Sequence, residues 1–313
     1  MNAGDTAAAS FGPAGLMVFE RGWLSSNSVL FLGTPGSPST LVDTGYVSHA
    51  GQTLSLVSHA LRGQPLQRIV NTHLHSDHCG GNAVLQAAHA CEVWVPAGEW
   101  DKVTPWDDGQ LSYVATGQYC PAFRASGRLH AGDELGLGGR LWRVLAAPGH
   151  DPESIMLYQA DERTLISADA LWENGFGVVF PEIEGISAFD DVAATLDLLS
   201  SLRVDWVVPG HGRPFSDVSG ALARARSRLA AFRSDPRKHA SHAAKVLLKF
   251  HLLEVRRQPG AELHAWARGV PYLRLLHQAH FAERGFQDWL DERLRELLAA
   301  SALNFVDGDW LDA

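Results

Sequence analysis

A run of histidine and aspartate residues directly after a short apolar segment constrains this chain more than any other feature. Residues 72–82 read THLHSDHCGGN. In an extended backbone, side chains two positions apart project to the same side, so His73 and His75 are able to share one metal ion. Asp77 and His78 lie where the chain turns into the next predicted helix, so they point elsewhere and are able to bind a second ion. Imidazole and carboxylate ligands together suit Zn, Fe or Mn.

Three further candidate ligands follow other apolar runs. His150, Asp169 and His211 end the segments LAAPGH, LISAD and VVPGH. Predicted strands and helices alternate through this part of the chain, which indicates an α/β fold with mixed sheets. Because active sites of α/β folds lie at strand ends, where loops converge, we predict that these three residues join the histidine-rich run in one metal centre.

The predicted elements divide the chain into two parts. Strands are expected at 28–32, 40–42, 68–71, 91–95, 141–146, 155–158, 164–167 and 204–208, with helices at 49–62, 82–90 and 190–202. Residues 96–134 have little periodicity and are predicted to form a long functional loop. The second part is predicted to hold helices at 221–233, 240–257, 270–283 and 286–300, then a hairpin around Asp307 and Gly308. We predict a catalytic domain over 1–215 and a helical, winged-helix-like domain over 216–313.

The pattern THLHSDH…PGH…SAD…PGH, preceded by LVDTG at 41–45, resembles the metallo-β-lactamase superfamily in its glyoxalase II-like branch. The resemblance covers about residues 15–215 and implies an αββα sandwich, with two mixed sheets packed face to face and helices outside. It also implies that Asp43 supports the metal site structurally. The ligand set that it implies is His73, His75 and His150 for the first ion, Asp77, His78 and His211 for the second, and Asp169 as a bridge. True β-lactamases of this superfamily generally lack an aspartate at the last position, so the resemblance disfavours antibiotic hydrolysis.

The resemblance implies two divalent cations, zinc before iron or manganese, and a hydrolytic reaction. Two such ions lower the pKa of a shared water from about 15.7 towards 7, and the hydroxide attacks an ester, thioester or lactone. We predict that Asp77 is catalytic as well as a ligand, because its carboxylate is able to accept a hydrogen bond from that hydroxide. Two alternatives stay open, a nuclease or phosphodiesterase and an iron-dependent persulfide dioxygenase with one Fe held by two histidines and one aspartate.

The parts of the chain that select the substrate are less sharply defined. The aromatic residues of 100–123 are predicted either to cover the metals as a lid or to pack the segment against the domain. Trp172, Phe176 and Phe180 are predicted to form a pocket wall. Cys79 is predicted to be a packing residue, and the ten histidines outside the ligand set are predicted to lie on the surface or on helices.

Charge is distributed unevenly along the chain. Residues 1–212 carry a net charge of −13, whereas residues 213–257 carry +8. This basic segment is predicted either to be a solvated helical face or to hold an anionic substrate tail through cations such as Arg228 and Lys245. Aromatic residues are not interleaved with its basic ones in the manner of an RNA-binding groove, which disfavours a nucleic-acid partner while the nuclease alternative stays open.

The cellular setting is predicted from what the sequence lacks. Its three cysteines in 313 residues cannot form a disulfide framework. No apolar run approaches the roughly 20 residues that span a bilayer, and the N-terminal segment lacks the basic start of a signal peptide. We therefore predict a cytoplasmic enzyme that acts on a small molecule and does not contact a membrane.

Overall fold

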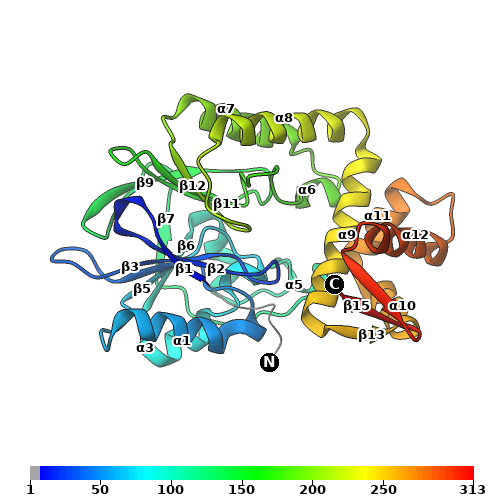
Figure 1. Ribbon diagram of the computed structural model, residues 1–313, viewed down its shortest axis with the longest axis horizontal. Helices are drawn as coiled ribbons and strands as arrows, with labels where there is room; N and C mark the ends of the chain where they lie inside the picture. Colours follow the sequence, from blue (N-terminus) through cyan, green and yellow to red (C-terminus); the bar gives the residue numbers. More distant parts are fainter. Residues whose placement is uncertain (1–7) are drawn as a thin grey trace.

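The computed structural model describes the backbone of residues 8–313, together with the side chains of all of these except residues 8–11 and 14. Two β-sheets pack face to face, and helices cover both outer faces (Figure 1). Helices α7 (Phe189–Ser201) and α8 (Val218–Ser234) lie on one side, and α1 (Ala50–Leu61) and α3 (Asn82–His89) lie on the other. The predicted α/β class and αββα sandwich are therefore confirmed.

The first sheet has seven strands in chain order, and its pairing changes part-way from antiparallel to parallel. Pairing is antiparallel up to the fourth strand and parallel from there to the seventh. Its strands are β1 (Ala8–Phe11), β2 (Met17–Glu20), β3 (Ser28–Phe31), β4 (Thr40–Val42), β5 (Arg68–Val70), β6 (Glu92–Pro96) and β7 (Gly127–Leu129). Within β5, Ile69 faces the outer helices and Val70 faces the other sheet, as the two-residue period of a strand requires.

The second sheet has five strands in the order β12-β11-β10-β9-β8. All of its pairs are antiparallel except the parallel pair of β11 and β12. Its strands are β8 (Glu134–Leu137), β9 (Arg140–Ala146), β10 (Ile155–Gln159), β11 (Thr164–Ala168) and β12 (Trp206–Pro209). β10 and β11 are buried along their whole length, because one face meets the first sheet and the other meets helices.

Three apolar cores hold the sandwich together. The core between the sheets contains the T-shaped pair Phe31 and Trp142, whose ring centroids are 5.2 Å apart. A second core lies between the first sheet and its helices, where α1 buries Val57 and Leu61. A third lies between the second sheet and its helices and includes Leu196 of α7. Because buried apolar side chains interdigitate at near-crystalline density, these cores fix where the strands end.

Residues 96–134 differ from the predicted long loop. They contain the short helices α4 (Trp100–Val103) and α5 (Tyr113–Thr116) as well as strand β7. The sequence of β7, Gly-Arg-Leu, is too short and too polar to show a strand period. Strands β1 and β2, each four residues long, were likewise not predicted.

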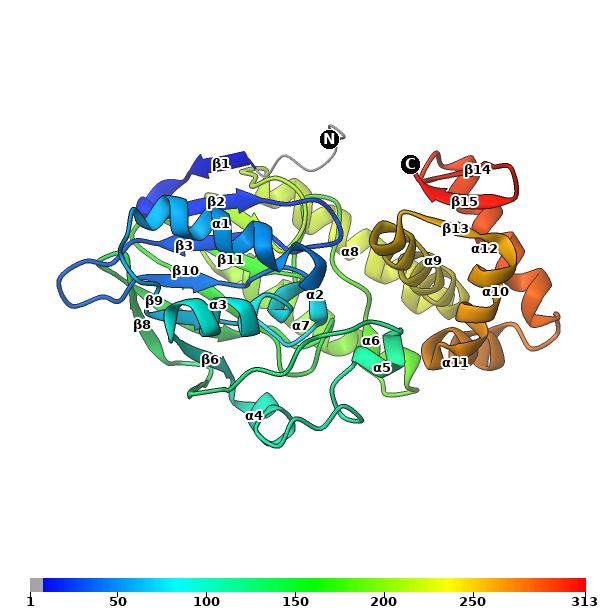
Figure 2. The ribbon, with the colours of Figure 1, turned by 90° about the horizontal axis from the view of Figure 1, so that it is seen from below.

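The C-terminal part is mostly helical and lies beside the sandwich (Figure 2). Its elements are α9 (Pro236–Val255), β13 (Arg257–Pro259), α10 (Gly260–Gly269), α11 (Pro271–His280), α12 (Phe286–Ala299), β14 (Leu303–Val306) and β15 (Asp309–Asp312). The predicted hairpin is confirmed, and Asp307 and Gly308 at its turn both have positive φ angles. It gains β13 as a third strand. Helix α10 was not predicted, because the preceding Gln-Pro-Gly indicated only a break.

The boundary between the two parts stays a prediction. Side chains of α8, among them Leu229 and Phe232, belong to the core of the second sheet, whereas the core of the C-terminal helices takes in α9 from Ala240 onward, together with Val178 and Ile183 of the catalytic part. We therefore propose that the C-terminal unit begins at α9 rather than at residue 216. Within residues 8–313, no helix is long and apolar enough to cross a membrane.

Candidate metal centre

The fold brings all seven predicted metal ligands to one edge of the sandwich. Each lies in a loop or short helix just after a strand, and each is at least nine-tenths buried. His73 and His75 follow β5, while Asp77 and His78 lie in the four-residue helix α2 (Ser76–Cys79). The other three follow strands of the second sheet: His150 after β9, Asp169 after β11 and His211 after β12.

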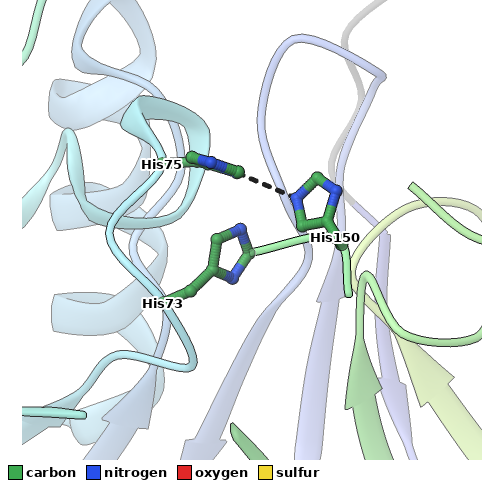
Figure 3. A group of neighbouring side chains, drawn as sticks. All are labelled: His73, His75 and His150. Carbon is green, nitrogen blue, oxygen red and sulfur yellow. Dashed lines mark hydrogen bonds between the residues drawn. The ribbon is translucent and has the colours of Figure 1, made fainter. Parts of the chain in front are cut away.

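Three imidazoles form the first group, His73, His75 and His150. Their potential ligand atoms all lie within 4.8 Å of one another, and the rings converge on one point (Figure 3). Nδ1 of His75 lies 2.8 Å from Nε2 of His150. Nε2 of His73 is buried and has no hydrogen-bond partner among the described residues. An uncompensated buried nitrogen is costly, so this arrangement suits a cation that all three nitrogens face.

The second group is Asp77, His78 and His211, whose ligand atoms are equally close together. Nε2 of His211 lies 3.0 Å from Oδ2 of Asp77. Nε2 of His78 lies 3.9 Å from the same oxygen and has no hydrogen-bond partner among the described residues. This group offers two nitrogens and one carboxylate, a donor set typical of zinc and related ions.

Asp169 lies between the two groups. Its Oδ1 is 3.5 Å from Nε2 of His78, and its Oδ2 is 3.4 Å from Nε2 of His150. The indole Nε1 of Trp172 donates a hydrogen bond of 3.1 Å to Oδ1, which orients the carboxylate. A Cβ atom at Gly210 would lie only 2.0 Å from that oxygen, so the glycine is required for the close approach of the two chain segments.

Two of the imidazoles are held in place by hydrogen bonds behind them. Nδ1 of His78 donates to Oδ2 of Asp43 at 2.7 Å, and Nδ1 of His150 donates to the carbonyl of Val178 at 2.5 Å. Each bond leaves Nε2 with a lone pair that faces the site. Asp43 is itself fixed by the backbone N–H and hydroxyl of Thr72, at 2.9 and 2.7 Å. The supporting role that the resemblance implied for Asp43 agrees with this geometry.

The electrostatics of the site favour bound cations. Burial lowers the pKa of His73 well below its usual value, and burial lowers the pKa of His75 and His150 to about 4, so these rings are neutral and able to coordinate. Around His78 the effect of burial is outweighed by Asp169, Asp43 and Asp77, which raise its pKa. The three carboxylates thus concentrate negative potential at the second group. The residues therefore fit a pair of divalent ions.

A small apolar pocket opens next to the metal ligands. Trp172 and Phe180 contribute to its wall as predicted, but Phe176 does not, because it packs against Phe232 in the core of the second sheet. The opposite wall was not predicted at all. It consists of Val246, Leu247 and Phe250, which come from the C-terminal helix α9.

The aromatic residues of 100–123 do not form a lid. Trp106, Tyr113 and Phe123 pack under the first sheet, so the packing alternative is correct for them. The segment reaches the pocket through the polar side chains of Thr116 and Gln118 instead. Cys79 is a buried packing residue, as predicted.

The basic segment does not supply a cation to the pocket. Nζ of Lys245 pairs with Glu296 at 2.9 Å, and the guanidinium of Arg228 covers Gly175 and donates to the carbonyl of Phe176 at 3.3 Å. No lysine or arginine lines the pocket among the residues that the structure describes. Of the two alternatives for this segment, the one in which Arg228 and Lys245 fold over the metal edge is therefore wrong. Glu296, the partner of Lys245, lies on α12, about fifty residues further along the sequence.

The sequence did not predict two contacts near the site, a hydrogen bond to a buried histidine and the stacking of an indole on a candidate ligand. His239 and His251 lie on helix α9, as the prediction allows, but both are buried, and Nε2 of His239 accepts a hydrogen bond from the backbone N–H of Val179. Trp23 stacks on His211, with ring centroids 5.4 Å apart and planes at 5°. No spacing rule connects Trp23 with a ligand nearly 190 positions away, so this contact had no signal in the sequence.

Comparison with known proteins agrees with this geometry. The model of the family described as "Metallo-beta-lactamase superfamily" matches residues 21–211, which include every ligand and more than half of the chain. The chain belongs to this superfamily. Similar curated proteins include a hydroxyacylglutathione hydrolase of Methylococcus capsulatus, 32% identical over 50% of this chain and 52% of that protein. Another, from Rhodopseudomonas palustris strain HaA2, is 36% identical over 38% and 39% of the two chains.

The matched part of this chain spans about half or less of the length of these curated relatives. Solved structures extend the likeness in fold. A beta-lactamase domain protein from Burkholderia ambifaria has a TM-score of 0.62 at 22% identity, covering 89% of this chain and 91% of its own. A metallo-beta-lactamase family protein from Thermus thermophilus has a TM-score of 0.54 at 21% identity over 100% and 99%. The shared fold thus includes the C-terminal region.

Proposed function

We propose that this protein is a metal-dependent hydrolase that cleaves a small ester, thioester or lactone at a dinuclear centre. The observation that carries the proposal is the pair of adjacent ligand groups with Asp169 between them. These two groups, with one carboxylate between them, would hold two divalent ions. The names of the similar hydroxyacylglutathione hydrolases support hydrolysis of a thioester.

The residues that would hold the ions follow from the geometry. His73, His75 and His150 would bind the first, Asp77, His78 and His211 the second, and Asp169 both. Zinc is favoured by the nitrogen-rich donor set, with iron or manganese as alternatives. When bound, two such ions lower the pKa of a shared water towards neutrality and polarise the carbonyl that is to be attacked.

The side chains themselves orient the reactants and handle the proton. Asp77 stays ionised, because His78 and His211 lower its pKa against the opposing effect of burial. Its Oδ2 lies beside Nε2 of His211 and Nε2 of His78, and it is able to accept the proton of an attacking water. Hydrogen bonds to Asp43 and to the carbonyl of Val178 hold the rings of His78 and His150 in a fixed orientation. The indoles of Trp23 and Trp172 cover His211 and exclude bulk water from that side.

The experiment that tests this proposal combines metal analysis with a substrate panel. Protein purified without chelator is analysed for Zn, Fe and Mn and then assayed against thioesters, lactones and phosphodiesters. The proposal expects two ions per chain and hydrolysis of at least one carboxylic ester or thioester, lost in His211→Ala together with one ion. A single Fe per chain with oxygen uptake, or cleavage of phosphodiesters alone, would contradict it.

The cytoplasmic location stays a prediction, and it is supported by three buried cysteines that are all unpaired.

A further inference from the structure

The pocket beside the metal ligands has a lining that identifies the kind of group it accepts. Outside the ligands, the described lining residues are Trp23, Thr116, Gln118, Trp172, Val178, Phe180, Val246, Leu247 and Phe250. Only Thr116 and Gln118 among them are polar without an aromatic ring. Oε1 of Gln118 already accepts a hydrogen bond from the hydroxyl of Ser76. The wall away from the metals is thus aromatic and aliphatic.

We propose that this pocket binds an uncharged, apolar acyl group of the substrate, and that α9 provides the surface that recognises it. The inference rests on the proposed hydrolase function and names the substrate class for it. A carboxylate or phosphate that extended along this wall would lose its hydration and meet no cation in return, which is strongly unfavourable. The nearest basic side chains of α9 are turned to other partners, as Lys245 is to Glu296 and Lys249 to Asp312.

The apolar wall is held rigidly by contacts behind it. The ring of Phe250 packs edge-on against Tyr46 of the catalytic part, with centroids 5.3 Å apart. Phe180 lies between His75, at 4.6 Å, and Tyr272 of α11, at 5.8 Å. Leu247 is 2% exposed and belongs to the C-terminal core. A wall fixed from behind is preorganised, so binding an acyl chain costs little ordering of the protein.

The size of the cavity limits the length of the acyl group. Its volume is about 80 Å³. An engineered apolar cavity of about 150 Å³ takes up benzene, and metal ligands line part of the present space, so it suits a chain of at most about three carbon atoms beyond the carbonyl. Each methylene that fits an apolar pocket changes discrimination by about 10–200-fold. A butyryl group is therefore the expected optimum among straight chains.

The first test uses matched esters on the metal-loaded protein. 4-Nitrophenyl acetate, butyrate and octanoate vary the chain length, and 4-nitrophenyl hemisuccinate replaces the end of the butyryl chain with a carboxylate. We expect kcat/KM for the butyrate to exceed that for the hemisuccinate at least tenfold. Equal or faster hydrolysis of the hemisuccinate would overturn the inference while leaving the hydrolase function intact.

Two variants assign the recognition to α9. Phe250→Ala should raise KM for the butyrate several-fold with kcat nearly unchanged, and it should improve the octanoate relative to the butyrate. Phe250→Leu keeps an apolar wall and should restore most of the butyrate KM. Phe305→Ala, at a half-exposed phenylalanine of β14, is the matched control and should leave every ester unchanged. Identical chain-length preference in Phe250→Ala and Phe305→Ala would remove α9 from recognition.

A second measurement does not depend on turnover. Saturation-transfer NMR on the metal-free protein compares 2-pentanone with levulinate, which bears a carboxylate on the same chain. We expect transfer to 2-pentanone that is lost in Phe250→Ala and transfer to levulinate that is at least several-fold weaker. Stronger transfer to levulinate would contradict an apolar pocket. Failure of all esters together with failure to bind metal would instead overturn the proposed function.

Discussion

The two sides of the pocket differ in where their residues come from and in how they are fixed. The metal side consists of seven polar side chains from loops and the short helix α2, which follow strands of both sheets, and hydrogen bonds to buried acceptors such as Asp43 orient some of them. The α9 side consists of three apolar side chains from one helix, held by packing. Under the proposals above, the metal side would determine the reaction and the α9 side would determine which substrate enters.

The largest expected effect comes from removing the side chain that both ligand groups share. Asp169→Ala should lower the occupancy of both ions, because its two oxygens face His78 and His150, and hydrolysis should fall to background. Elemental analysis of the purified variant measures the occupancy. Full double occupancy in Asp169→Ala would contradict its position as a bridge, and with it the claim that the metal side acts as one unit.

Asp77→Asn separates metal binding from proton transfer on that same side. The amide oxygen is still able to coordinate, but it accepts a proton far less readily than the carboxylate. We expect most of the metal to remain and turnover to fall by about 10²–10⁴, as is typical for the loss of a general base. Steady-state kinetics on variant protein of known metal content is the measurement. Wild-type kcat with both ions present would leave Asp77 as a ligand only.

An acid titration tests how firmly the two sides are joined. His239 at the start of α9 accepts from Val179, next to the carbonyl that holds His150. Burial lowers the pKa of His239 to about 4 from an unfolded value of about 6.5. The unfolded state therefore takes up the proton first, so the free energy of unfolding should decrease as pH falls from 6.5 to 4, by at most about 1.4 kcal/mol per pH unit from this group.

Urea unfolding of the metal-free protein at several pH values measures this dependence. His239→Gln retains an acceptor oxygen without a titratable group, so its stability should decrease less steeply over the same range. Parallel pH profiles for the two proteins would show that His239 does not contribute to the coupling between α9 and the metal side.

Asp43→Asn tests the support of the metal side from behind. Asp43 has a positive φ angle of 56°, which asparagine tolerates, so the backbone should be preserved. The loss of the charged acceptor for His78 should weaken binding of the second ion about 10–100-fold, the usual range for such outer partners. Competition against a chelator of known affinity measures the change, and unaltered affinity would assign Asp43 to folding alone.

The smallest expected effect concerns the cations of the C-terminal region. Lys245→Ala should leave KM for both neutral and anionic esters within twofold of wild type, because Lys245 is paired with Glu296 on the outside of the helix pack. The comparison is made at low salt, where screening is weakest. A raised KM for the hemisuccinate alone would show that this charge reaches the substrate, and the apolar description of the α9 side would then need revision.

The two sides of the pocket also differ in how far the sequence predicts them. All seven candidate ligands were predicted because each follows a local rule, a polar residue at the end of an apolar strand, and the compact THLHSDH run supplies four of them. Strands with clear apolar runs, such as β10 and β11, were found for the same reason. The α9 side depends on which helix faces the site, and that choice is made by packing between segments some 170 residues apart. No local sequence pattern around Val246 or Phe250 predicts that α9 faces the site.

The charge of the segment 213–257 did not predict where its basic side chains lie in the fold. A net charge of +8 over 213–257 is a correct count, but its meaning depends on partners elsewhere in the chain. Arg226 pairs with Asp197 of α7 and Arg257 with Asp309 of β15, contacts that only the tertiary structure creates. Phe176 fails as a pocket residue in the same way, since its position beside Asp169 in the sequence does not decide which way the ring turns.

Leu247 contributes both to the pocket and to the core that holds the C-terminal helices together. Selection for a larger substrate at this position therefore meets a trade-off, since replacing a buried leucine by alanine costs a fold about 2–5 kcal/mol. Val246 is only partly buried, so replacing it should cost the fold less stability. Adaptation to new substrates, in nature or in directed evolution, is thus expected to begin at Val246 and to reach Leu247 only after stabilising changes elsewhere.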